Sequence, residues 1–108
     1  MGEYTIIWRK KARQQYIEHL EYAQAEFGNK AFYGWITAVA EMEKHLRQNP
    51  RHYSVKRLLP SDFKEYRGCT VMKNFKFIYS FDDIHKTVYV ETLWDMRMNP
   101  RKLQKLLG

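Results

Sequence analysis

Apolar residues recur every three or four positions along two long stretches of the chain, which is the spacing of helices with one buried face. The first stretch carries Ala12, Tyr16, Leu20, Ala23 and Phe27. The second carries Phe32, Trp35, Ile36, Val39, Met42 and Leu46. Gly28-Asn29 ends the first helix, and the second stops before Pro50, because the residue preceding a proline is pushed out of the helical region. So short a link predicts an antiparallel helical hairpin.

Elsewhere the apolar pattern has the two-residue period of strands. Residues 4–8 alternate in this way at the start of the chain, with β-branched and aromatic side chains. After an aperiodic connection from Arg51 to Glu65, strands are predicted over residues 69–72, 75–81 and 87–94. Residues 82–86 form the turn between the last two.

The strand residues fall into two sets if that turn joins its strands in simple register. The set expected to face the helices is Phe75, Phe77, Tyr79, Phe81, Tyr89 and Leu93. The opposite set is Asn74, Lys76, Ile78, Ser80, Val88, Val90 and Thr92. Trp35 on the second helix is then expected to pack against Phe77 or Tyr79.

The order of elements predicts an α+β fold. It has an N-terminal strand, an antiparallel helical hairpin packed on an antiparallel β-sheet, and a short C-terminal helix. The 108 residues suit a single domain spanning 1–108.

The net charge of +7 favours an anionic partner, whether RNA, DNA or an acidic protein. The lone Cys69 has no partner for a disulfide within the chain, and no secretory leader pattern appears, so a cytoplasmic protein without a membrane span is expected. Histidine, cysteine and carboxylate residues show no metal-ligand spacing, and we expect neither a metal nor an organic cofactor. His19 and His45 lie next to charged residues on the predicted helices and are expected to be solvated.

Four segments carry a resemblance to a known family: "IIWRKKA" near the start, "LRQNPRHY" at the end of the hairpin, "FKFIYSFDD", and "VETLWDMRMNPRKL". In this order and spacing they resemble the RelE/ParE superfamily, the toxins of bacterial type II toxin–antitoxin pairs. The similarity runs through residues 4–104. It implies a cognate acidic antitoxin as a partner.

In the RelE-like subgroup, which cuts messenger RNA on the ribosome, the resemblance implies catalytic roles for three basic residues. Lys76, in "FKFIY", stands where that subgroup usually has Arg in a "YR(I/L)xY" pattern. Arg97 matches the arginine after the last strand, and Arg67 lies in the basic region of a preceding strand. A lysine lacks the two-point fork that Arg offers a phosphate. The tail "RKLQKLLG" has no Tyr or His for proton transfer.

These departures favour a ParE-like toxin, which binds DNA gyrase without hydrolytic residues of its own. The alternatives are a RelE-like endonuclease acting on the ribosome and mRNA, and an inactive or repurposed family member. Structural roles are open as well: Arg97 as a holder of the Asn99-Pro100 turn, and Lys76 as a surface lysine.

Overall fold

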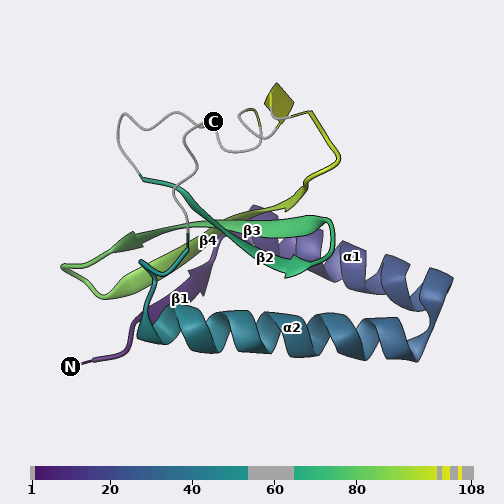
Figure 1. Ribbon diagram of the computed structural model, residues 1–108, viewed down its shortest axis with the longest axis horizontal. Coiled ribbons are helices and arrows are strands. Elements are labelled where there is room, and N and C mark those ends of the chain that lie inside the picture. Colours follow the sequence, from purple (N-terminus) through teal and green to yellow (C-terminus); the bar gives the residue numbers. More distant parts are fainter. Residues whose placement is uncertain (1, 54–64, 100, 103–104, 106–108) are drawn as a thin grey trace.

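The computed structural model describes residues 2–53, 65–99, 101, 102 and 105. Its elements follow the order β1 (Thr5–Trp8), α1 (Lys10–Phe27), α2 (Asn29–Gln48), β2 (Arg67–Met72), β3 (Phe75–Asp82) and β4 (Thr87–Asp95). The two helices lie against one face of the four-stranded sheet (Figure 1). The α+β class and the order of these elements are therefore confirmed.

The helical hairpin forms as its apolar stripes predict. Gly28 joins the two helices with φ of 85°, a left-handed conformation that favours glycine. Its backbone N–H donates to the Gln24 carbonyl oxygen at 2.9 Å and so caps α1. Since no residue separates Gly28 from the start of α2, the chain reverses within one position and the helices run side by side (Figure 1).

The sheet has the strand order β1-β4-β3-β2 and mixed strand directions. The pairs β2–β3 and β3–β4 are antiparallel, but β1 runs parallel to β4. The predicted all-antiparallel sheet is therefore wrong at this one pair. A two-residue period reveals a strand and its buried face, but carries no information about the direction of the neighbouring strand.

A β-bulge in β4 changes which residues face the helices. Ile78 pairs with Thr92, whereas the next residue, Tyr79, pairs with Val90, so Glu91 is the extra residue. Beyond the bulge, Val88 and Val90 join the core under the helices, and Tyr89 turns to the other face. The predicted faces of Val88, Tyr89 and Val90 are therefore wrong. The simple register with β4 holds only for Phe75 to Ile78, and it shifts by one residue from Tyr79 onward.

The core lies between the helices and this face of the sheet. Its fully or nearly buried members include Ala12, Trp35, Val39, Met42, Leu46, Cys69, Phe77, Tyr79, Val88, Val90 and Leu93. Phe75 and Phe81 pack at its margin, so the predicted facing of the odd positions of β3 is confirmed. Trp35 makes its ring contacts with Phe75 and His19, at centroid distances of 5.1 and 4.5 Å, and not with Phe77 or Tyr79 as expected.

The end of the chain lies mostly outside the described residues. The predicted C-terminal helix falls there, since only Arg101, Lys102 and Lys105 are described beyond Asn99. Within the described ranges, no helix is both long enough and apolar enough to cross a bilayer.

Candidate functional site

Arg97 lies just after β4, on the side of the sheet that carries the helices. Its guanidinium donates from Nε and Nη2 to the two carboxylate oxygens of Asp95, at 2.9 and 2.7 Å. The same group lies 5.7 Å from the ring centroid of Phe75, within the range of a cation–π contact. Arg97 is thus oriented by its own chain, with most of its side chain still exposed.

Arg67, at the start of β2, is bound on several sides. Its Nη1 donates to the backbone carbonyl oxygens of Arg51 and Tyr53, at 3.0 and 2.6 Å, and its Nη2 donates to Glu65 at 2.7 Å. Only 14 % of its side chain is exposed. This arginine therefore ties the segment after α2 to the sheet, and has little surface to offer a ligand.

Lys76 lies on the face of the sheet away from the helices, because side chains alternate along β3 and the adjacent Phe75 and Phe77 face the helices. Its strand partners are Thr70 and Trp94. Ile78 and Trp94 form a small second apolar cluster on this face.

Tyr66 and Met96 pack against this second cluster. Tyr66 is a phenol on the same face as Lys76, and sequence reasoning missed it because it lies just before β2, outside any periodic segment. The signal that points to it is its position next to Arg67, in the basic region of that strand.

The three predicted residues do not converge. Arg67 pairs with Tyr79 and Arg97 lies over Phe75, so the two arginines are separated along β3 by four residues, or about 13 Å at roughly 3.3 Å per residue. Lys76 points to the opposite face. No hydrogen bond or ion pair links any two of the three within the described ranges.

His19 on α1 lies beside Arg97, not in solvent as the sequence suggested. Its ring is packed against Phe75 and Trp35, at centroid distances of 4.4 and 4.5 Å. Burial lowers the pKa of His19, while Asp95 opposes that shift. The imidazole is therefore held mainly neutral at physiological pH.

The His19 ring lines a hollow of about 320 Å³ at the end of the hairpin, between the helices and the β2–β3 turn. Other lining residues include Tyr22, Ala23, Phe27, Ala31, Trp35, Met72, Lys73, Asn74, Phe75 and Arg97. The sequence contains an indication that His19 lies near the buried face of α1. His19 precedes Ala23, a residue of the apolar stripe, by one helical turn.

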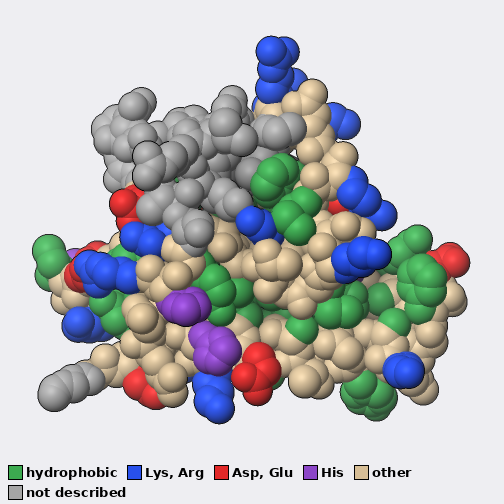
Figure 2. Space-filling model, in the orientation of Figure 1, with side chains coloured by type: hydrophobic (Ala, Val, Ile, Leu, Met, Phe, Trp, Pro, Cys, Tyr) green, Lys and Arg blue, Asp and Glu red, His purple; other side chains and the backbone are tan. Residues whose placement is uncertain are grey.

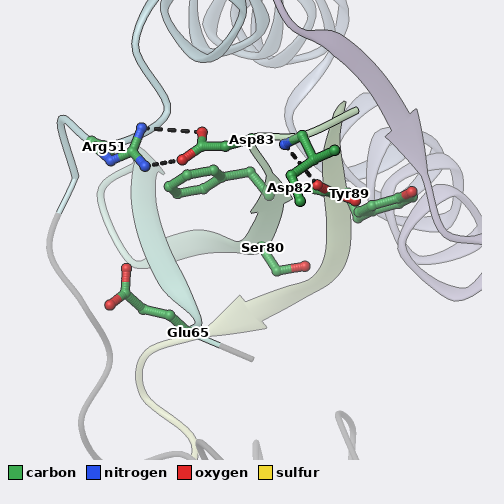
Figure 3. Close-up of a pocket in the computed structure, with 8 residues that line it drawn as sticks. Arg51, Glu65, Ser80, Asp82, Asp83 and Tyr89 are labelled. Carbon is green, nitrogen blue, oxygen red and sulfur yellow. Dashed lines mark hydrogen bonds and ion pairs between the residues drawn. The ribbon is translucent and has the colours of Figure 1, made fainter. Parts of the chain in front are cut away.

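A second hollow, of about 600 Å³, lies at the opposite end of the sheet, by the β3–β4 turn (Figure 3). Two of its lining residues, Arg51 and Asp83, form a two-point ion pair, and the Tyr4 hydroxyl also donates to Asp83. The hydrogen bonds from Arg51, followed by that from Tyr4, lower the pKa of Asp83.

The remaining acidic groups around this second hollow are also paired. Asp82 accepts from the backbone N–H of Ile84 at 2.9 Å and contacts the His85 imidazole, which lowers the pKa of Asp82. Glu65 is bound to Arg67. These contacts fix the turn and the segment after α2, and they account for the charges there without a ligand.

The described ranges contain no group of three or more His, Cys, Asp or Glu side chains arranged to hold a metal ion. Cys69 is buried, and burial raises the pKa of its thiol, which disfavours the reactive thiolate.

Comparison with known proteins identifies the fold. No family model matches the sequence, and no curated protein matches it. Among solved structures, the chain is similar to one from a chromosomal ParDE toxin–antitoxin system of P. aeruginosa, with a TM-score of 0.65 and 15 % identity. The similarity covers 86 % of this chain and 96 % of the other. The protein therefore has a ParE-like α+β fold, and the resemblance to the RelE/ParE superfamily is confirmed at the level of the fold.

Proposed function

We propose that this protein is the toxin component of a type II toxin–antitoxin system. The observation that carries the proposal is the fold shared over 86 % of the chain with a member of a ParDE system. The four sequence segments with the RelE/ParE pattern and the net charge of +7 support it independently of the fold.

Within this class, we propose that the toxin inhibits growth by binding DNA gyrase and not by cutting RNA. Attack of a 2′-hydroxyl on the adjacent phosphate needs a proton acceptor, a proton donor and cations on the same phosphate. The scatter of Lys76, Arg97 and Arg67 over two faces and two ends of the sheet supports a mode of action that needs no such constellation.

A ribosome-dependent mRNA endonuclease is the second candidate, and one observation favours it. Lys76 and Tyr66 lie on the same face of the sheet, Tyr66 through its packing against Ile78 and Trp94. A lysine for the phosphate and a phenol for proton transfer are two of the groups that such a reaction uses.

Transcript mapping distinguishes the two candidates. After induction of the wild-type protein, primer extension is expected to find intact messenger RNA while growth stops. Cleavage at codon-related positions, lost in Lys76→Ala or Tyr66→Phe while the variants stay folded, supports the endonuclease instead. Harmless expression of a folded, full-length chain indicates an inactive or repurposed protein.

The proposed partner is an acidic antitoxin whose flexible segment folds over this basic toxin. If the adjacent gene encodes a small acidic protein, co-expression is expected to yield a stable complex that survives moderate salt and to restore growth. A chain that stays alone when co-expressed with that protein counts against this pairing.

A further inference from the structure

Aromatic side chains form one wall of the hollow around His19, at the end of the hairpin. His19, Trp35 and Phe75 contact one another, and the Tyr22 ring lies 6.0 Å from the imidazole. Tyr22 is itself 6.3 Å from the Phe27 ring. Five rings from two helices and a strand are therefore linked into a continuous surface.

Two of these rings are unusually exposed. Tyr22 is 55 % exposed and Phe27 is 70 % exposed, and the Tyr22 ring lies next to that of the half-buried His19. Figure 2 shows hydrophobic side chains on the surface at the end of the molecule where the helices meet, with both basic and acidic side chains beside them. Exposed apolar groups gathered beside a hollow are typical of a binding site.

The rim of the hollow is cationic. Lys73 from the β2–β3 turn and Arg97 both line it, and Lys73 has no hydrogen bond or ion pair with another described residue. Arg97 uses Nε and Nη2 for Asp95, which leaves Nη1 available to a ligand. With His19 held mainly neutral, the charges of Lys73, Arg97 and Asp95 sum to a positive rim.

We propose that this hollow binds an unpaired nucleotide of single-stranded nucleic acid, with its base against the exposed rings and its phosphate at Lys73 and Arg97. Single strands are bound by this combination of aromatic stacking and nearby cations, since every base has a π-face. The volume of about 320 Å³ is at the lower end of the roughly 300–1,000 Å³ typical of small-ligand sites. The proposal does not rest on gyrase or the ribosome as the target.

Fluorescence anisotropy with labelled hexa-adenylate tests the proposal on the full-length chain. Tyr22→Ala and Phe27→Ala are expected to weaken binding by roughly 5- to 150-fold, the range that corresponds to loss of one base stack. Tyr33→Ala is the matched control, because Tyr33 is 62 % exposed but does not line the hollow. Its affinity is expected to stay that of the wild type.

Salt dependence separates the phosphate contact from stacking. Lys73→Ala is expected to reduce the slope of log affinity against log salt by about 0.7, the value for one phosphate contact on a single strand. Tyr22→Ala is expected to leave that slope unchanged. The exposed Lys44, on α2 and outside the hollow, provides the matched control as Lys44→Ala.

Chemical shifts locate the bound probe. Addition of adenosine monophosphate is expected to shift the ring resonances of His19 and not those of His85, at the opposite end of the sheet. Equal affinity of wild type, Tyr22→Ala and Phe27→Ala for hexa-adenylate overturns the proposal. So does a preference for an acidic peptide with an aromatic anchor over hexa-adenylate, which identifies the hollow as a protein-docking site.

Discussion

Arg97 and Asp95 form a two-point ion pair two residues apart, at the end of β4. The guanidinium meets both carboxylate oxygens, and the Arg97 backbone N–H donates to Oδ1 at 3.0 Å as well. An incoming phosphate has to share this arginine with a carboxylate that already holds it. The pair therefore orients Arg97 over Phe75 and leaves Nη1 as the guanidinium nitrogen that Asp95 does not use.

The stability contributed by this pair is expected to depend on pH. The hydrogen bonds from Arg97 lower the pKa of Asp95. Because the unfolded value is about 3.9, the contribution is complete above that pH and is lost as the pH falls through the lowered folded-state pKa. Arg97→Ala is therefore expected to raise the Asp95 pKa, and to reduce the free energy of unfolding more near neutral pH than at about pH 2.

Carboxyl NMR titration and urea unfolding at the two pH values measure both effects of Arg97→Ala. Arg101→Ala is the control, since Arg101 is an exposed arginine for which the described part of the chain provides no carboxylate partner. An Asp95 titration curve that is the same in Arg97→Ala and the wild type contradicts the assignment.

Trp35 connects the helical hairpin to the edge of the core. It is 4 % exposed and contacts Phe75 and His19. Trp35→Ala is expected to lower the free energy of unfolding by about 3 to 5 kcal/mol, through lost burial and the cavity left behind. Tyr33 lies two residues before Trp35 on the same helix but is exposed. Tyr33→Ala is expected to change the free energy of unfolding by less than about 0.5 kcal/mol. Similar urea midpoints for the two variants rule out this packing.

Gln15 on α1 binds β4 directly beyond the bulge. Its amide oxygen accepts from the Leu93 backbone N–H and from the Thr92 hydroxyl, each at 2.9 Å. Gln15→Ala leaves a partly buried N–H without this acceptor, at an expected cost of about 1 to 3 kcal/mol.

Gln14→Ala is the matched control for this contact, because Gln14 bonds only the exposed Glu18 in the described structure. Urea unfolding measures the difference, and hydrogen exchange at the Leu93 amide locates it. If that amide exchanges at the wild-type rate in Gln15→Ala, the contact does not persist in solution.

The sequence predicted the helices and most of the sheet because their apolar periods are long and uninterrupted. Ala12 to Phe27 and Phe32 to Leu46 define the two buried faces without help from other parts of the chain. The bulge at Glu91 has no such pattern. It depends on contacts between distant residues, since the Glu91 carboxylate accepts from Ser80 at 2.6 Å and from Arg9 at 3.2 Å.

The candidate site was less predictable, for a similar reason. Motif matching pointed to Lys76 and Arg97 but carried no information about the face that each occupies or about the Asp95 pair. The position of His19 beside Arg97 depends on how α1 crosses the sheet. A neighbouring charge suggested a solvated histidine, whereas tertiary packing placed its ring against both Trp35 and Phe75.

Gyrase supercoiling in the presence of the purified chain tests the central claim most directly. The proposed mode of action predicts that wild type and Lys76→Ala inhibit supercoiling at similar concentrations, because binding does not require a phosphate-stabilising lysine. Supercoiling that proceeds unchanged with a saturating amount of folded wild-type protein, while the same protein stops growth in cells, contradicts it.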